Sequence, residues 1–385
     1  MKIVKIERFP LKVEASKTEN GTPIRLFKSV DIDTLIIKIT TDAKVVGFGE
    51  VSRASAPDQS YRGLLEWIEI YAKALDGVDA LNLAALNGKM DDVRKFSSAE
   101  CRPARAAFDM AIYDLIGKSR GVPAHEVLGG AYRTEMEMCA TLGEGTYEQL
   151  AADARSLVEQ GVRGLKVNIG DSFSSDKRNS DSYYRAKKKL QAVLAAVGPQ
   201  IMVTADANQF WKNVGQVRSL VASLLEENYY HNLSLEQPLH HLDLGGHAEL
   251  RRSLSIPVVL GDGVISPQSM VQISRMAAAD GVALNINTAG GLGSARQIAD
   301  ICEASAIGVY VRTKTGSRLA DAAHCQLAAT IRDPLPLNVG DQLGFDDNLF
   351  SGGFEIRDCR IVLSDKPGLG VYVNEQALLA HAIDI

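Results

Sequence analysis

Strand-like and helix-like segments alternate regularly over most of the chain after Gly130. Short runs of β-branched and apolar residues recur at intervals of roughly 25 to 35 residues, which is the period of βα units in a parallel α/β barrel. The expected strands are 136–141, 164–169, 202–205, 234–237, 258–261, 282–286 and 307–311, with a weaker candidate at 335–339. This nearly eight-fold repeat predicts a TIM-type (β/α) barrel over residues 131–350.

Segments of helical periodicity fill the intervals between these strands. The expected helices are 147–159, 183–197, 214–226, 267–278 and 293–304. A doubly wound open sheet is the alternative fold, but it usually carries a glycine-rich phosphate-binding turn after its first strand. The segment Leu142-Gly143-Glu144-Gly145 is a poor match to such a turn, so the barrel is favoured.

Residues 1–130 follow a different pattern, in which strand-like runs come first and helices follow. The expected strands are 2–14, 34–40 and 45–50. They predict an antiparallel meander, followed by helices between residues 64 and 118. We therefore expect an α+β capping domain that ends near Gly129-Gly130. Residues 351–385 again contain strand-like runs, and we expect this tail to return to the capping domain.

Three polar segments stand out between the expected elements. Residues 16–28 and 52–61 are rich in turn-forming residues, and long polar loops in a compact domain are often functional. They are either lids over a ligand or plain exposed loops. The highly charged segment 171–189 is expected to be a solvated loop and helix face rather than an anion-binding site.

Three consecutive strands of the expected barrel end on or next to a carboxylate: Asp206, Glu236 and Asp262. The carboxyl ends of barrel strands lie at one end of the barrel, so these acids would repel each other unless a cation lay between them. Oxygen donors without histidine or cysteine favour Mg²⁺ over zinc. We expect one Mg²⁺ ion here, although each acid taken alone could instead cap a loop or pair with a lysine or arginine.

Such a metal site predicts a class of chemistry. A substrate carboxylate bound to Mg²⁺ could lose its α-proton, because the metal stabilises the resulting enediolate as a Lewis acid. The net charge of −5 argues against a nucleic-acid or anionic-membrane partner and fits a small-molecule partner.

The sequence also indicates where the protein works. The N-terminal residues lack the apolar core of a signal peptide, and no apolar run approaches the roughly 20 residues of a membrane span. Five scattered cysteines indicate reduced, buried thiols rather than a disulfide scaffold or a structural zinc site. We therefore expect a cytoplasmic protein.

Several short motifs occur in a characteristic order along the whole chain. They are Ala107-Phe108-Asp109-Met110-Ala111-Ile112-Tyr113-Asp114-Leu115, Leu128-Gly129-Gly130, Asp206-Ala207-Asn208-Gln209, Glu236-Gln237-Pro238, Gly290-Gly291-Leu292 and Pro367-Gly368-Leu369-Gly370. Together they resemble the enolase superfamily, specifically the muconate-lactonizing-enzyme-like branch of the mandelate racemase family. The resemblance implies a homo-oligomer and a Mg²⁺-dependent reaction that begins by removing the α-proton of a carboxylate substrate.

The sequence departs from that family at both positions of its usual catalytic lysines. The family's second strand ends in Lys-X-Lys, whereas this chain has Lys166-Val167-Asn168. In the sixth strand, Asn287 most plausibly stands where the family has its second lysine. An amide cannot act as a proton-transfer base near neutral pH. Racemisation by two lysines at Asn168 and Asn287 is therefore in doubt.

Two lysines are candidates to replace them. Lys166 lies on the same side of its strand as Asn168 and is the first candidate base. Lys314, near the end of the seventh strand, is the second candidate, or alternatively a binder of the substrate carboxylate or a surface lysine.

The resemblance also indicates residues that contact the substrate. Asp341 resembles a position from which relatives bind a substrate amine or support the site, and Asn208 belongs to the motif that follows Asp206. Gly263 replaces an acid that commonly follows Asp262 in relatives. We expect no histidine base, because His240, His241 and His247 follow the fourth strand in a loop or helix and His324 falls within an expected helix.

These features predict a Mg²⁺-dependent lyase or isomerase for a small carboxylate, such as an amino-acid or proline derivative. Loss of both lysines favours β-elimination, which needs one base, over epimerisation by an unusual base. Cycloisomerisation or syn-elimination through Lys166 alone is a further enzymatic alternative. The alternative of another class is a protein that binds the metal and a carboxylate without turnover.

Overall fold

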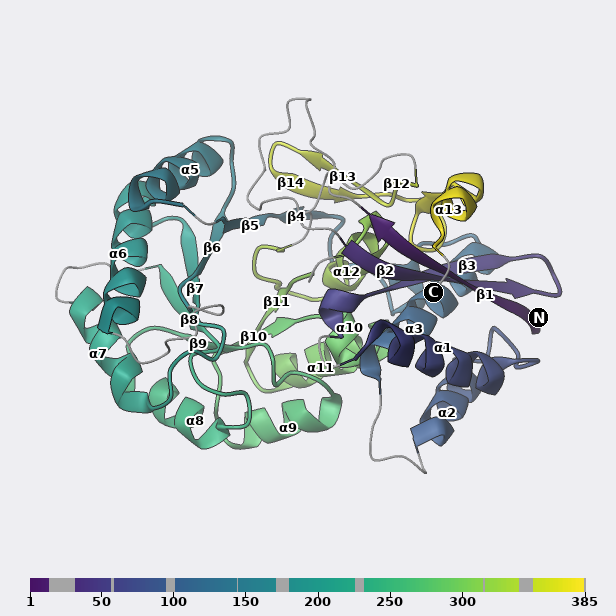
Figure 1. The fold of residues 1–385 in the computed structure, drawn as a ribbon, viewed down its shortest axis with the longest axis horizontal. Coiled ribbons are helices and arrows are strands. Elements are labelled where there is room, and N and C mark those ends of the chain that lie inside the picture. Colours follow the sequence, from purple (N-terminus) through teal and green to yellow (C-terminus); the bar gives the residue numbers. More distant parts are fainter. Residues whose placement is uncertain are drawn as a thin grey trace.

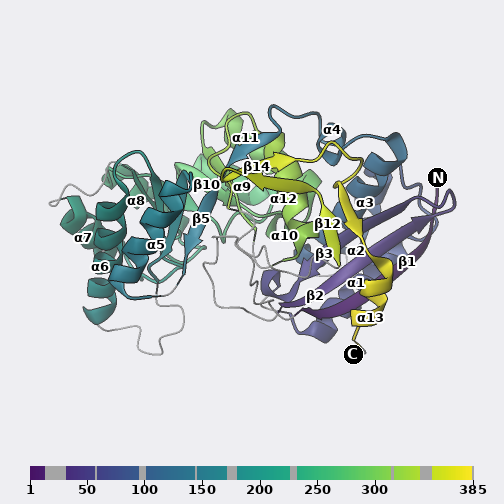
Figure 2. The same ribbon diagram turned by 90° about the horizontal axis from the view of Figure 1, so that it is seen from above.

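The computed structural model describes residues 1–13, 32–56, 59–94, 101–143, 145–170, 180–225, 232–313, 316–338 and 349–383. It consists of a barrel and an α+β domain that lies beside it, with the C-terminal tail running across both (Figures 1 and 2). Among the described residues, no helix combines the length and the apolar character that crossing a membrane requires.

The barrel sheet has seven parallel strands, arranged in space in the order of the sequence. They are β5 (Cys139–Leu142), β6 (Gly164–Asn168), β7 (Met202–Asp206), β8 (Leu233–Glu236), β9 (Val258–Leu260), β10 (Gly281–Leu284) and β11 (Gly308–Val311). Residues 334–338 close the gap between the edge strands, because Pro334 and Asn338 bridge to β11 and its end while Leu337 bridges to Met138. The predicted TIM-type barrel fold is thus confirmed.

A ring of helices surrounds these strands (Figure 1). The helices are α5 (Tyr147–Glu159), α6 (Ser180–Val197), α7 (Val214–Leu225), α8 (Leu244–Ser253), α9 (Pro267–Arg275), α11 (Leu292–Ala304) and α12 (Arg318–Ala329). In α5, Leu150, Ala154 and Leu157 are buried at helical spacing, and Thr146 with Gln149 forms a capping box at its start. This local pattern is the reason why the helix ranges could be predicted closely.

The sixth barrel strand ends earlier than its apolar sequence predicts. β10 stops at Leu284, and the short helix α10 (Ile286–Ala289) follows directly. The side chain of Asn285 caps α10 by accepting a hydrogen bond from the backbone N–H of Thr288 at 3.1 Å. An asparagine cap therefore ends the strand where the residue pattern alone would extend it to Ile286.

The N-terminal domain packs an antiparallel sheet against helices. Its elements are β1 (Ile3–Val13), β2 (Ile32–Thr41), β3 (Val46–Ser52), η1 (Arg53–Ser55), α1 (Tyr61–Leu75), α2 (Leu83–Arg94), α3 (Arg102–Arg120) and α4 (Ala124–Val127). β3 lies directly on α3: a Cβ atom at Gly49 would lie 1.9 Å from the carbonyl oxygen of Ala107. Only glycine permits this close approach of strand and helix.

The C-terminal tail contacts both parts of the molecule (Figure 2). It contains β12 (Phe350–Gly352), β13 (Phe354–Arg357), β14 (Arg360–Leu363), β15 (Val371–Val373) and α13 (Glu375–His381). β14 pairs with β4 (Glu135–Glu137) at the entry to the barrel, while Ala382 bridges to Leu11 of β1. The tail therefore joins the barrel as well as the N-terminal domain.

Buried acids of the N-terminal domain cap two barrel helices. Glu50 accepts hydrogen bonds from the backbone N–H groups of Ser317 and Ala320 at the start of α12. Asp109 accepts one from the N–H of Leu292 at the start of α11. The N-terminus of a helix has unpaired N–H groups and favours negative charge, so these acids join the two domains through helix ends.

A mostly apolar cavity of about 260 Å³ lies at the amino ends of the barrel strands. Its lining includes the first residues of five strands, Cys139, Gly164, Met202, Gly281 and Gly308, together with Tyr310. Three of these residues are glycines, and because glycine has no side chain, this end of the barrel is partly hollow. All five cysteines of the chain are buried thiols.

Candidate active site

The carboxyl ends of β6, β7 and β8 bring three of the predicted site residues into one row. The strand register pairs Asn168 with Asp206, and Asp206 with Glu236. The backbone leaves the strand conformation immediately afterwards, because Asn208, Gln209 and Gln237 have positive φ angles of 47°, 60° and 43°. Such φ angles are uncommon for residues other than glycine and often occur at functional sites.

Lys166 lies between two of the expected metal ligands. Its Nζ is 2.6 Å from Oδ2 of Asp206 and 3.0 Å from Oε1 of Glu236, and the residue is only 4% exposed. Burial by itself would lower the pKa of Lys166, but the two carboxylates outweigh it and raise the pKa. Lys166 is therefore held as an ammonium ion when only these partners surround it.

The pKa values of the two acids beside Lys166 are shifted in opposite directions. Burial opposes ionisation of Asp206, but Lys166 and Arg312 hold the pKa of Asp206 below its usual value. Burial and the nearby charge of Asp206 raise the pKa of Glu236. Two acids close together are pushed apart in pKa because both cannot ionise equally easily in a buried site.

Arg312 follows β11 and lies on the other side of Glu236. Its Nε is 3.6 Å from Oε1 of Glu236, and its Nη2 is 3.7 Å from Oδ1 of Asp262. Tyr310, from the same strand, donates a hydrogen bond to Oε2 of Glu236 at 3.4 Å. Glu236 is therefore contacted by two cations and a phenol.

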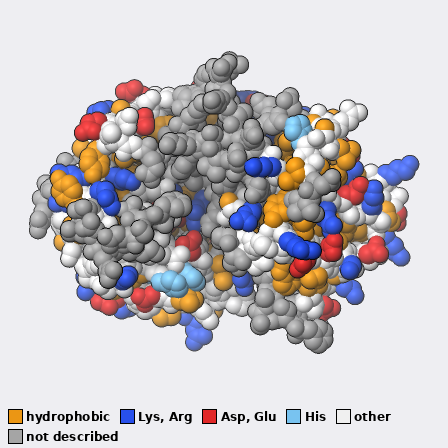
Figure 3. Space-filling view, viewed as in Figure 1, with side chains coloured by type: hydrophobic (Ala, Val, Ile, Leu, Met, Phe, Trp, Pro, Cys, Tyr) orange, Lys and Arg blue, Asp and Glu red, His pale blue; other side chains and the backbone are white. Residues whose placement is uncertain are grey.

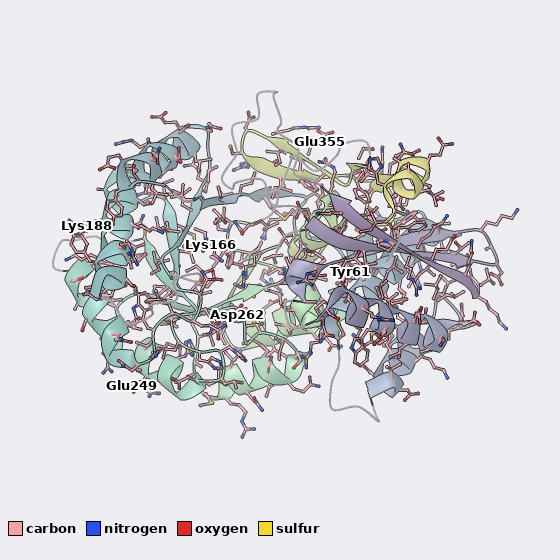
Figure 4. The ribbon with its side chains drawn as sticks, viewed as in Figure 1. Tyr61, Lys166, Lys188, Glu249, Asp262 and Glu355 are labelled. Carbon is pink, nitrogen blue, oxygen red and sulfur yellow. The ribbon has the colours of Figure 1, made fainter. Side chains whose placement is uncertain are left out.

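Asp262 is held by two glutamines. The side chain of Gln209 donates to Oδ2 of Asp262 at 2.7 Å, and its carbonyl oxygen accepts from the backbone N–H of His241. The side-chain carbonyl of Gln237 accepts from the backbone N–H groups of both Gly261 and Asp262. Lys166 and Asp262 both lie inside the ring of barrel strands (Figure 4).

The donor chemistry of this cluster fits a divalent cation such as Mg²⁺. All three candidate ligands are carboxylates from neighbouring strand ends, and counting only the described residues, three acids with two cations leave a formal charge of −1. In the part of the chain that the structure describes, no three acidic, histidine or cysteine side chains are already grouped as metal ligands. Lys166 and Arg312 instead lie between the acids.

The asparagines predicted at the lysine positions lie in different surroundings. Asn168 is partly exposed, and its Oδ1 accepts a hydrogen bond from Nδ2 of Asn208 at 3.4 Å. Asn287 is buried in α10, and its Nδ2 donates to Oγ of Ser55 in the N-terminal domain. The residue that directly follows β10 is Asn285, which is two positions before Asn287.

Two further sequence candidates, Lys314 and Asp341, lie outside the described residues, as do all of residues 16–28 and the 171–179 part of the charged segment. Among the histidines, His324 is buried and its pKa is lowered to about 4 by burial. Its Nε2 accepts from the N–H of Ile286, so it supports α10 as a neutral ring. His240 is exposed and stacks on His241, and Figure 3 shows histidine side chains at the barrel surface.

Sequence reasoning did not identify Arg312, Gln209 or Tyr310 as site residues. Gln209 was within reach, because it belongs to the motif that begins at Asp206. The signal for Arg312 and Tyr310 was their place in the last strand of the repeat, Gly308–Val311 and the residue after it. In the sequence, neither residue differs from an ordinary barrel or surface residue.

Comparisons with known proteins agree with this architecture. The Enolase C-terminal domain-like family model matches residues 149–377, and the model of the mandelate racemase / muconate lactonizing enzyme N-terminal domain matches residues 13–129. The N-succinyl-L-Arg/Lys racemase of Bacillus cereus is 26% identical over 350 residues, which cover 90% of each chain. The cis-3-hydroxy-L-proline dehydratase of Roseibium aggregatum is 26% identical over 381 residues, 96% of each chain.

Other curated relatives are named as epimerases and as a muconate cycloisomerase. Among solved structures, the muconate lactonizing enzyme of Pseudomonas putida has the same fold, with a TM-score of 0.85, 23% identity and coverage of 100% of both chains. The named relatives are enzymes that carry out different reactions on one common architecture.

Proposed function

Because this chain belongs to the mandelate racemase and muconate lactonizing enzyme family of the enolase superfamily, we propose that it is a lyase or isomerase acting on a small carboxylate. The reaction begins with removal of the α-proton of the substrate. The observation that carries this proposal is the buried ammonium group of Lys166 between two strand-end acids, at the end of the barrel where such enzymes place their chemistry.

Mg²⁺ is the proposed cofactor, held by Asp206, Glu236 and Asp262. Family members generally use this ion, and the all-oxygen donor set with its residual negative charge supports the assignment. When bound, the ion supplies Lewis-acid stabilisation of the negative charge that develops on the substrate carboxylate.

Lys166 is the proposed group that moves the α-proton. Its Nζ lies between Asp206 and Glu236, and the side chain is buried. Nζ can accept the α-proton only as a neutral amine, so the ammonium form that these acids favour must first lose a proton. Asn168 and Asn208 lie beside Asp206 and offer amide groups that can orient a polar substrate without exchanging protons. Lys314 is the second candidate base, and Asp341 the candidate partner of a substrate amine.

The pattern of candidate bases favours dehydration over epimerisation. Epimerisation requires proton transfer on both faces of the substrate, whereas β-elimination can proceed with one base. A relative named as a hydroxyproline dehydratase supports a proline or amino-acid derivative as the substrate class. Cycloisomerisation through Lys166 alone is the next candidate reaction, since another relative is named as a cycloisomerase.

A second candidate function is binding of a metal and a carboxylate without turnover. The observation that favours it is that both asparagines after the sixth strand make structural hydrogen bonds. Asn285 caps α10, and Asn287 donates to Ser55. Neither amide can transfer a proton.

Solvent deuterium exchange separates these functions. The protein is incubated with Mg²⁺ and pools of amino acids, hydroxyprolines and acid sugars in D₂O, and NMR detects α-deuterium or dehydration. We expect wild type to react with a member of these pools and Lys166→Ala to lose the reaction while it retains metal binding. Lys212→Ala, which removes an exposed lysine, should react normally.

The opposite result would support the binding function. In that result, the wild type shows no α-deuterium exchange, whereas a variant that carries Asn168→Lys together with either Asn287→Lys or Asn285→Lys does exchange. The Asn285 variant is included because this residue directly follows β10.

A further inference from the structure

Arg312 occupies a position between two of the proposed metal ligands. Its guanidinium lies 3.6 Å from Glu236 and 3.7 Å from Asp262, measured between the nearest nitrogen and oxygen atoms. Its side chain is 12% exposed, so the charge is largely shielded from water. A cation that used Oε1 of Glu236 and Oδ1 of Asp262 would compete with this guanidinium for the same two oxygens.

The surrounding backbone is built to accept this side chain. A Cβ atom on Gly261 would lie 2.8 Å from Nη2 of Arg312 and 3.3 Å from Oε1 of Glu236. The backbone of Arg312 is fixed by hydrogen bonds of its N–H to Leu284 and of its carbonyl oxygen from Asn285. Glycine at position 261 therefore leaves the room that the guanidinium fills.

Within the described part of the chain, Glu236 and Asp262 hold the guanidinium by charge rather than by short hydrogen bonds. Both of its contacts exceed the normal length of a hydrogen bond, about 2.7 to 3.2 Å for N–H···O. Among the described residues, Nε of Arg312 has no hydrogen-bond partner although it is buried. Lys166, by contrast, contacts its two acids at 2.6 and 3.0 Å. Arg312 is therefore the cation of the cluster that is easier to displace.

We propose that Arg312 is a built-in competitor of the divalent cation and sets the affinity of the site for it. The guanidinium offsets part of the negative charge of Glu236 and Asp262 in the free protein and must move away before both acids can bind one metal ion. The inference rests on the proposed function, since it requires the metal site of Asp206, Glu236 and Asp262. Its consequence is metal binding weaker than three carboxylates alone would give.

Metal titration tests the competition without an activity assay. Mg²⁺ binding is measured by isothermal titration calorimetry, and Mn²⁺ binding by electron paramagnetic resonance, for wild type, Arg312→Met and Arg312→Gln. Methionine fills the space with an uncharged chain, and glutamine keeps a polar group. Both variants should bind metal at least about tenfold more tightly than wild type, because a nearby positive charge is removed.

Arg332→Met is the matched control, since it removes an equal charge from an exposed arginine that pairs with Glu303. It should bind metal as wild type does. Circular dichroism verifies that each variant is folded, and if Arg312→Met is unfolded then Arg312→Gln decides.

Two results would overturn the inference, and they differ in what else they remove. If wild type and the folded Arg312 variants bind metal equally, or the variants bind more weakly, competition is excluded while the metal site stands. If none of them binds metal, the inference fails together with the proposed metal site.

Discussion

The two ends of the barrel are built from the same strands, but charged side chains lie at one end and mostly apolar or small residues at the other. At the carboxyl ends, Lys166, Glu236 and Arg312 belong to a buried charged cluster. At the amino ends, a mostly apolar cavity of about 260 Å³ lies among the first residues of five strands. Tyr310 separates these regions, since it lines the cavity and its hydroxyl group donates to Glu236.

This difference shows that the strand repeat determines the shape of the barrel, whereas the residues at the strand ends determine which charged or apolar groups each end presents. Charges in the cluster depend on one another, because a buried charge that loses its partner is costly. Among the described residues that line the cavity, Asp280 alone is charged and pairs with Arg251, so fewer side chains there depend on a charged partner. Substitutions should therefore have large effects at the charged end and small effects at the hollow end.

The largest effect is expected for Lys166→Met, which leaves Asp206 and Glu236 without their shared cation. Removing one partner of a buried ion pair typically costs about 3 to 5 kcal/mol. Urea denaturation should show this loss in the free energy of unfolding. Lys212→Met, at an exposed lysine, should stay within about 0.5 kcal/mol of wild type. Equal stability of the two variants would mean that the charges are not mutually dependent.

A pH-dependent effect is expected at Asp109, which caps α11 at the charged end. Burial raises the pKa of Asp109 to about 6, above the value near 3.9 of an unfolded chain. The protonated acid is therefore favoured in the folded state, so this contribution is fully present below pH 4 and is lost as the pH rises through 6. The loss is on the order of 3 kcal/mol, since one pKa unit corresponds to about 1.4 kcal/mol.

Asp109→Asn should remove this dependence. Denaturation of wild type and variant at several pH values between 4 and 7 measures the difference between their unfolding free energies. A constant difference over this range would show that Asp109 keeps an ordinary pKa.

A smaller effect is expected for Gly261→Ala. The added Cβ would lie 2.8 Å from Nη2 of Arg312, so the guanidinium must move away from its position between the acids. Overpacking of this kind typically costs about 1 to 3 kcal/mol, and the flexible arginine places the expected loss near 1 kcal/mol. Thermal unfolding measures it, and an unchanged or higher melting temperature would contradict the described packing.

The smallest effect is expected for Gly308→Ala, the corresponding change at the hollow end. Its Cβ would meet its nearest neighbours at 3.7 Å and 3.8 Å, which are ordinary contacts. Replacing glycine with alanine without strain stabilises by roughly 0.4 to 1 kcal/mol through the unfolded state. The same thermal unfolding assay should show a slightly raised melting temperature. If Gly308→Ala lowered the stability as much as Gly261→Ala, the two ends of the barrel would not differ in their tolerance of an added methyl group.

The fold could be predicted from the sequence because local patterns determine it. The βα repeat gave the barrel, and the placement of Asp206 and Glu236 in one row followed from strand ends lying side by side. The end of β10 was harder, because the cap by Asn285 involves one side-chain hydrogen bond that an apolar pattern does not reveal.

Contacts between distant parts of the chain could not be predicted. Arg312 meets Glu236 and Asp262 only after the barrel closes, and no local pattern distinguishes it from a surface arginine. The positive φ angle of Gln237 is likewise imposed by its long-range bonds to Gly261 and Asp262. Such residues are identified from the ion pairs and hydrogen bonds that they make in the folded structure.

The capping of α11 and α12 by Asp109 and Glu50 has a consequence for how such proteins can be recombined. A chimera that joins this barrel to the N-terminal domain of a relative would leave α11 without a side-chain cap and α12 with the cap of Ser317 alone, unless acids stood at the same two places. These two carboxylates are therefore among the contacts that a compatible N-terminal domain has to supply, together with Arg105, which donates to Gly290, and Ser55, which accepts from Asn287. At this interface, the two carboxylates of one domain recognise the starts of two helices of the other.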